Sequence, residues 1–295
     1  MQLKMTDYIK QHGTTLEFSS NSSWVILNPI EKRIKEKIER VGIPLKDWDI
    51  SINYGIKTGC NEAFIINKAK RDELIAKDKK SVEIIRPILR GRDIARYQAN
   101  FSDLYLINTH NGIPSKNIPP IKVEKYPAIK KHLDRYLEKI KNREDQGITP
   151  YNLRSCAYMD DFSKRKIIWG EISDKPKFAL DFNASYYPEA TTFILTGNNI
   201  DYLFIILNSR ISEWLFSNVG TTTGVGTIRW KKFTIEQLLV VPPSIDILSK
   251  TNCLIEGLIN TQLDYRDFEK ETNTFINSIY SLDKKEIEYI NSWSK

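Results

Sequence analysis

The chain has few of the residues from which covalent or metal cross-links are built. Its 295 residues include three cysteines, Cys60, Cys156 and Cys253, and three histidines, all widely spaced. No two cysteines form a CxxC pair, so neither a disulfide framework nor a zinc site is expected. Unpaired cysteines are typical of a reducing compartment.

Long apolar runs are also missing. No stretch of about 18 apolar residues occurs, and the N-terminal MQLKMTDYIK lacks the apolar core of a signal peptide. We therefore expect a cytoplasmic protein with no membrane partner.

Motifs for catalysis and cofactor binding are absent as well. The sequence contains no P-loop and no GxSxG serine motif. A methyltransferase would need a glycine-rich loop after its first strand and usually an Asn-Pro-Pro-aromatic motif, which Asn117-Ile-Pro-Pro120 only partly matches. We predict no catalytic residues, no metal site and no bound cofactor in this chain.

What the chain does have is an excess of basic residues, unevenly placed. It carries 44 Lys and Arg against 37 Asp and Glu, a formal net charge of +7. Residues 246–295 hold nine acidic and six basic side chains, which leaves +10 for the first 245 residues. Such an excess is compatible with a polyanionic partner, whose surface would lie before residue 246.

Hydrophobic periodicity indicates a mixed α/β fold. The clearest helix follows Asn28, a favourable N-cap, with Pro29 in the first turn, Glu31 completing a capping box and Gly42 ending it. Its apolar face is spaced by four, four and three residues: Ile30, Ile34, Ile38 and Val41.

Strands and helices then alternate along the chain. We expect two strands, 50–54 and 63–66, around the turn 55–61. An apolar segment follows at 82–89, and further strands are predicted at 104–107, 166–169, 178–182, 192–195 and 238–241. Helices are predicted at 68–76, 126–140 and 200–216, the last apolar on most sides and therefore buried.

The composition changes at Pro242-Pro243, which is the best domain boundary. We expect an α/β region over residues 1–243, in which the first 22 or so are linker-like. Residues 244–295 should form a C-terminal helical region that packs on the α/β region or on a partner module.

Two segments combine glycine with cations and hydroxyl or amide groups, the residue types that bind phosphates and read base edges. The turn 55–61 contains Lys57, Thr58 and Asn61, and it reads equally well as an ordinary tight hairpin. Arg90 and Arg92 flank Gly91, and a surface salt bridge to Asp93 is as good an explanation as a phosphate contact.

Two more segments have a similar makeup. An aromatic-plus-arginine cluster follows Pro150, for which buried tyrosine packing is the alternative: Tyr151, Asn152, Arg154 and Tyr158. The Gly/Thr loop 220–227 contains Thr223, and Arg229 and Lys231 follow it. These residues suit contact with a phosphate, and the alternative is that the segment is simply a mobile loop.

These segments occur in an order that resembles a known family. The blocks are Trp24 with the helix 30–41, Gly55–Phe64, Ile85–Ile94, Lys166–Ile172, Leu203–Arg210, Gly224–Trp230 and Leu239–Pro243. Over about residues 22–292 the chain resembles the C-terminal target-recognition domain of TaqI-like adenine methyltransferases and of single-chain type IIG restriction–modification enzymes. The ending 276–288 is also similar, although Ser281 replaces the family's usual glycine.

The resemblance implies a reader of double-stranded DNA that holds the duplex against a methyltransferase, which flips the target adenine out of the stack. S-adenosylmethionine and Mg²⁺ would then belong to methyltransferase and nuclease modules in the same or another chain. The position of Met1 favours a fragment over a free-standing specificity subunit.

The resemblance also implies DNA contacts at matched positions: Lys57, Thr58, Asn61, Arg90, Arg92, Arg229 and Lys231, with Thr223 in the same loop as the last two. The segment 108–160 is least like the shared pattern. Sequence-specific readout is therefore expected there, with candidates Tyr151, Asn152, Arg154 and Tyr158.

Two other classes of function remain open from the sequence. One is a stand-alone divalent-metal nuclease, for which Asp161 and Glu171 flank a predicted strand without the compact spacing such centres need. The other is a protein-interaction module whose acidic helical tail docks a partner.

Overall fold

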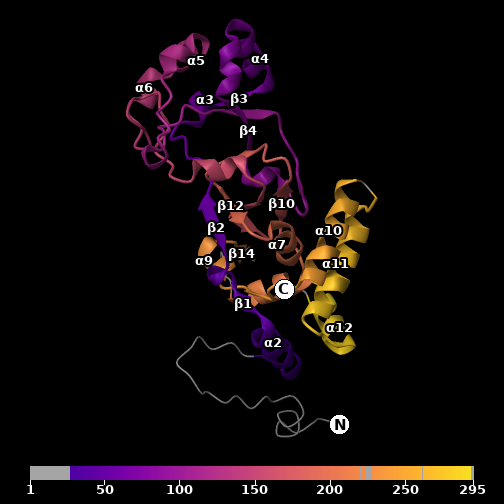
Figure 1. Cartoon of the computed structure of the whole chain (residues 1–295). Coiled ribbons are helices and arrows are strands. Elements are labelled where there is room, and N and C mark those ends of the chain that lie inside the picture. The colour runs from indigo at the N-terminus through magenta and orange to yellow at the C-terminus, as the bar shows by residue number, and fades with distance from the viewer. Residues whose placement is uncertain (1–26, 220, 223–227, 261, 294–295) are drawn as a thin grey trace, which may run out of the picture.

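The computed structural model describes residues 27–219, 221–222, 228–260 and 262–293 (Figure 1). Three features of the sequence analysis lie outside these ranges, namely the linker-like first residues with Trp24, the centre of the Gly/Thr loop, and its Thr223. Within them the fold is mixed α/β with helices at the C-terminal end, as expected.

A four-stranded antiparallel sheet occupies the middle of the molecule (Figure 1). Its strands, in spatial order, are β10 (Phe178–Asp181), β8 (Lys166–Gly170), β12 (Thr192–Gly197) and β2 (Ile50–Tyr54). Ile167 and Trp169 of β8 pack into one hydrophobic cluster, whereas Ile168 between them packs into a second cluster on the other face. Burial on both faces explains why this strand is apolar at successive positions.

A second sheet lies in the part of the molecule drawn uppermost in Figure 1. Its order is β11 (Tyr187–Pro188), β4 (Ile85–Leu89), β7 (Leu104–Ile107) and β3 (Ile65–Asn67), with only β11 and β4 parallel. The helices of this part are α3 (Asn61–Phe64), α4 (Lys68–Lys77), α5 (Pro127–Asp134) and α6 (Leu137–Ile140).

Within the described residues, three small sheets complete the strand pairing. They are β1 (Ile43–Pro44) with β15 (Leu239–Val240), β5 (Ile94–Ala95) with β6 (Gln98–Ala99), and β13 (Thr221–Thr222) with β14 (Ile228–Arg229) and β9 (Ile172–Ser173).

The predicted first helix is confirmed as α2 (Pro29–Val41). The Asn28 side chain accepts hydrogen bonds from the backbone N–H groups of Ile30 and Glu31 at 3.0 Å, and the Glu31 carboxylate accepts one from the Asn28 N–H at 2.8 Å. This is the reciprocal capping box that the sequence predicted.

The expected hairpin over residues 50–66 is wrong. Residues 61–64 form the helical turn α3, and β2 and β3 belong to different sheets, paired with β12 and β7. The segment 55–61 therefore carries the chain from one sheet to the other. Gly55 is needed because a Cβ atom at that position would lie 2.1 Å from the carbonyl oxygen of Glu189.

The predicted buried helix over 200–216 is instead two helices, α7 (Ile200–Leu207) and α8 (Arg210–Val219). The Asn208 side chain accepts from the backbone N–H of Phe178 at 3.2 Å and donates to its carbonyl at 3.0 Å. The Ser209 hydroxyl then accepts from the Ser212 N–H and starts the second helix. The predicted helix over 126–140 is likewise divided, between α5 and α6.

The C-terminal residues form three helices, α10 (Ile245–Ile259), α11 (Tyr265–Ile279) and α12 (Lys284–Ser292), after the short α9 (Lys232–Glu236). Figure 1 shows α10, α11 and α12, in orange to yellow, along one side of the central sheet. Leu254, Phe268 and Ile290 belong to the same hydrophobic cluster as Trp169 and α7. Among the helices of the described residues, none is long and apolar enough to cross a membrane.

Candidate nucleic-acid interface

Segments from distant parts of the sequence meet where the two main sheets join, around residues 188–192. The Gly55 and Ile56 N–H groups donate to Thr192 and Pro188, at 2.9 and 2.7 Å. The Glu189 N–H donates to Leu89, the Glu171 N–H to Thr191, and the Trp230 N–H to Glu171, at 2.8, 3.1 and 2.7 Å. We call this set the junction segments: residues 55–61, 89–93, 170–173, 188–192 and 228–231.

The junction segments carry most of the predicted contacts, including residues more than a hundred positions apart. Lys57, Asn61, Arg92 and Lys231 have exposed side chains, and Arg229 is 43% exposed. Backbone hydrogen bonding thus brings together segments whose exposed cations lie far apart in the sequence.

Two of the predicted cations share a carboxylate that sequence analysis missed. Asp145 lies 2.7 Å from the Lys57 ammonium and 3.0 Å from the Arg154 guanidinium. The hydrogen bond from Lys57 lowers the pKa of Asp145 below its ordinary value, so the carboxylate stays charged at neutral pH. The ion pairs with Asp145 set the positions of the Lys57 and Arg154 side chains. These side chains remain 56% and 55% exposed, so their charged groups still face solvent.

Thr58 and Asn152 are buried, at 2% exposure each. The Thr58 hydroxyl donates to the Asn61 side chain at 2.5 Å. The Asn152 amide donates to the carbonyls of Ile121 and His110 at 2.9 and 3.3 Å and accepts from the Thr149 hydroxyl at 2.6 Å. Both side chains have their hydrogen-bonding capacity taken up within the protein, so they shape the loops that carry the exposed candidates.

A buried arginine joins those two loops. Arg143 is 7% exposed and donates to the carbonyls of Thr58, Pro150 and Asn152, while its guanidinium lies 4.4 Å from the centroid of the Phe64 ring. Burial lowers its pKa. In sequence it stands within the charged run 141–145, which is typical of a solvated surface, so no pattern distinguished it.

The two predicted tyrosines are half-buried. The Tyr151 hydroxyl donates to Asp134 at 2.5 Å, and the Lys130 ammonium lies 5.1 Å from the centroid of its ring. Tyr158 packs edge-on against Phe162, and burial raises its pKa to about 12. Much of each ring is therefore used in packing, as the alternative interpretation held.

The two arginines of the segment 90–93 differ. Arg90 donates to both oxygens of Asp93, at 2.8 and 2.7 Å, which is the predicted salt bridge. Burial acts to raise the pKa of Asp93, but hydrogen bonds from Arg90 and Ser102 outweigh it and hold that pKa below its ordinary value. Arg92 is exposed and has no ion-pair partner within the described ranges.

Arg92 also lines a cavity of about 370 Å³ among the junction segments. The lining residues are Gly91, Arg92, Ile94, Gly170, Glu171, Ile172, Ser173, Lys177 and Thr191. Glu171 lines the cavity together with Arg92 and Lys177, so the cavity mixes charges of both signs.

The carboxylates considered for a nuclease are not brought together. Asp161 precedes β8 and Glu171 follows it, so the length of the strand, about 3.3 Å per residue, separates them. Both Asp161 oxygens accept hydrogen bonds, from Asn53 at 2.9 Å and Lys164 at 2.7 Å. In the part of the chain that the structure describes, no group of three or more His, Cys, Asp or Glu residues could hold a metal ion.

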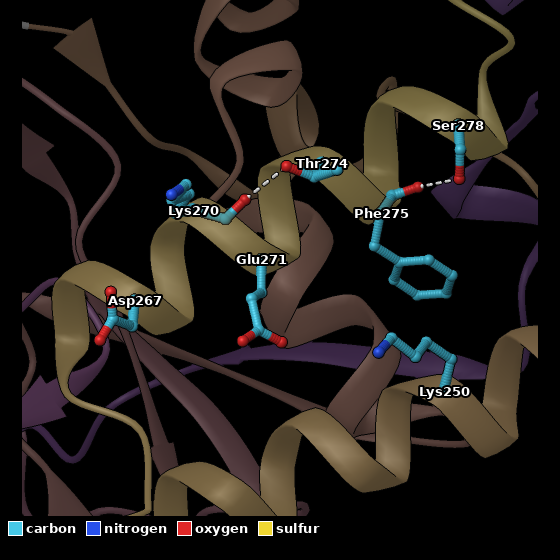
Figure 2. A pocket seen from close by; sticks show the side chains of 7 residues that line it. All are labelled: Lys250, Asp267, Lys270, Glu271, Thr274, Phe275 and Ser278. Atoms are coloured by element: carbon cyan, nitrogen blue, oxygen red, sulfur yellow. Dashed lines mark hydrogen bonds between the residues drawn. The ribbon is translucent and has the colours of Figure 1, made fainter.

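A groove of about 390 Å³ lies between α10 and α11, away from these residues (Figure 2). Figure 2 shows Lys250 of α10 facing Glu271 and Phe275 of α11. The hydroxyls of Thr274 and Ser278 donate to carbonyls of their own helix, at 2.9 and 2.6 Å. The groove's charges are balanced, and it has no surplus of cations for a polyanion.

Cysteine labelling provides a check on the 154–158 region. Burial raises the pKa of the Cys156 thiol to about 11, whereas the Cys253 side chain is exposed. At pH 8 about one Cys156 thiol in a thousand is ionised, so we expect iodoacetamide to modify Cys253 first and Cys156 at least about tenfold more slowly. Mass spectrometry of tryptic peptides over time would measure both rates, and equal rates would contradict the burial of Cys156.

Comparison with known proteins gives a family and a fold. A family model for the TaqI-like C-terminal specificity domain matches residues 86–240. The solved structure of the Type IIL restriction-modification enzyme MmeI in complex with DNA has a TM-score of 0.60 at 11% identity, covering 85% of this chain and 36% of that one. The type IIG restriction endonuclease BpuSI has a TM-score of 0.48 at 14% identity, covering 76% and 28%. The chain thus spans well under half the length of either enzyme. No curated protein matches it.

Proposed function

The chain belongs to the family of TaqI-like C-terminal specificity domains, and we propose that it recognises a double-stranded DNA sequence as the specificity part of a restriction–modification system. The DNA present in the MmeI complex supports this partner. We further propose that methylation and cleavage, with S-adenosylmethionine and Mg²⁺, belong to a methyltransferase or nuclease module in the same or another chain.

The observation that carries the proposal is the set of exposed cations that lie on the junction segments or, as Arg154 does, share an ion-pair partner with one of them. Lys57 and Arg154 are placed by one carboxylate, and Arg92, Arg229 and Lys231 lie on segments tied to the same strand ends. Phosphate contacts by such side chains supply affinity at any sequence, and base contacts add discrimination.

The burial of individual side chains divides the predicted contacts into two roles. We assign direct DNA contact to the exposed set: Lys57, Asn61, Arg92, Arg154, Arg229 and Lys231. Thr58, Asn152 and Arg90 act in positioning, because their polar groups are taken up by Asn61, by backbone carbonyls and by Asp93.

The C-terminal helices have a different proposed role. We propose that residues 244–295 form a helical region that packs on the α/β region 1–243 and offers its net charge of −3 away from DNA, toward the catalytic module. The groove between α10 and α11 is part of that surface. The nuclease alternative is not favoured, since Asp161 and Glu171 stand at opposite ends of β8.

Fluorescence anisotropy with a randomised duplex pool tests the proposal. We expect binding that weakens as salt rises, and Arg92→Ala should reduce the slope of log affinity against log salt by about 1, since one phosphate contact is lost. Lys284→Ala is the matched control, because Lys284 is 91% exposed on α12 and should leave the slope unchanged. Folded protein that shows no salt-dependent binding at low ionic strength would overturn the proposal.

A further inference from the structure

The segment 143–154, which we call the ribbon, is a loop whose two sides are joined by one isolated antiparallel bridge. Gln146 and Leu153 pair as an antiparallel bridge, and the Gly147 N–H donates to the Asn152 carbonyl at 2.9 Å. The turn between the two sides is closed by the Asn152 N–H, which donates to Thr149 at 3.0 Å. Ile148 stands in this turn.

The ribbon is held at its turn as well as at its base. The Asn111 side chain accepts from the Ile148 N–H at 2.8 Å and donates to the Ser155 hydroxyl at 2.8 Å. Gly147 allows this approach, because a Cβ atom there would lie 2.4 Å from the Asn111 oxygen. At the base, Arg143 binds the carbonyls of Pro150 and Asn152. The backbone of the turn is therefore fixed before any ligand binds.

This fixed turn presents an apolar side chain to solvent. Ile148 is 69% exposed, although its neighbours Asn152 and Leu153 are buried. A single exposed isoleucine has no special meaning by itself. Here, however, Asp145, three residues before Ile148, holds Lys57 and Arg154 through ion pairs, so one segment combines an exposed apolar group with two anchored cations that suit phosphates.

We propose that the ribbon enters the major groove and that Ile148 reads a thymine through its C5-methyl group. The major groove is wide enough for an α-helix or a two-stranded ribbon, so a loop whose two sides meet at one bridge fits it, and the thymine methyl is the apolar group that a base edge displays there. Lys57 and Arg154 would contact the flanking phosphates. This inference rests on the proposed function and assigns one specificity-determining residue to it.

The test removes the methyl group of the thymine or shortens the side chain of Ile148. A preferred duplex is first selected from a randomised pool with the full chain, and each thymine is then replaced by uracil in turn. At one position we expect the wild-type chain to lose roughly fourfold in affinity, the value of one buried methyl group. The Ile148→Ala variant should bind the thymine duplex more weakly and should not distinguish thymine from uracil at that position.

Ile245→Ala is the matched control, since Ile245 is 86% exposed at the start of α10 and should keep the wild-type sensitivity to uracil. Circular dichroism and thermal unfolding would confirm that both variants fold. The inference is overturned if no thymine methyl matters to the wild type, or if Ile148→Ala keeps the same sensitivity. Absence of any DNA binding by the wild type would instead overturn the proposed function itself.

Discussion

Replacing Lys166 with methionine is expected to lower the free energy of unfolding by about 3–5 kcal/mol, the cost of leaving one partner of a buried ion pair uncompensated. The Lys166 side chain has no solvent exposure, and its ammonium lies 2.6 Å from Asp181 and 2.7 Å from the carbonyl of Phe162. Burial lowers the pKa of Lys166, and the attraction of Asp181 opposes that shift. Without the ammonium, the Asp181 carboxylate would stay buried with only backbone donors.

Urea unfolding followed by circular dichroism would measure the loss. Lys164→Met is the matched control, because Lys164 is 59% exposed and pairs with Asp161, so its loss should cost less than about 1 kcal/mol. The double variant Lys166→Met with Asp181→Asn should recover part of the stability, since it removes both buried charges. Equal stability of the Lys166 and Lys164 variants would contradict the assigned role.

The buried pair also links stability to the candidate interface. Asp181 accepts hydrogen bonds from the N–H groups of Ser185 and Tyr186 at 3.0 and 2.9 Å, and so closes the turn that leads into β11. The next residues, 188–192, receive the backbone bonds of the 55–61 and 170–173 segments. This ion pair lies outside the candidate interface. It helps to fix residues 188–192, to which the 55–61 and 170–173 segments are hydrogen-bonded.

Periodicity and capping predicted much of the fold, because these signals are local. The capping box at Asn28 and the strands at 166–170 and 192–197 depend on residues within a few positions of one another. The pairing of β2 with β12 could not be predicted in this way, since it joins residues about 140 positions apart. The break at Asn208 was missed for the same reason, because its partner is the backbone of Phe178.

The candidate site shows a similar limit. DNA contacts were predicted for Lys57, Arg92 and Arg154 from the residue types of their segments, and all three side chains are exposed. Sequence does not tell whether a polar side chain is already occupied by the protein, as Thr58 and Asn152 are. It also gave no sign of Asp145 and Arg143, whose roles arise from contacts with loops that fold back on them.

Removing the two cations that share Asp145 is expected to have the largest effect on DNA affinity. The double variant Lys57→Ala with Arg154→Ala should bind the selected duplex roughly thirtyfold more weakly near 0.15 M salt, because two phosphate contacts are lost and each is worth about one released counterion. Anisotropy titration at constant salt would measure the change. Lys35→Ala with Lys284→Ala, which removes two exposed lysines from α2 and α12, is the control for net charge alone and should retain most of the affinity.

Neutralising the shared carboxylate should act in the opposite direction on random DNA. In Asp145→Asn the repulsion between this carboxylate and the phosphates is lost, so affinity for a random duplex should rise by roughly fivefold, equivalent to about 1 kcal/mol. Affinity for the selected duplex should not rise with it, because Lys57 and Arg154 lose the group that positions them.

The lowered pKa of Asp145 adds a pH dependence that the wild-type protein should show. Its carboxylate is charged throughout from about pH 5 to pH 8, and the wild-type ratio of selected to random affinity should fall only below that window, as protonation frees the two cations. If Asp145→Asn left this ratio unchanged, Asp145 would not be what positions the two cations for sequence readout.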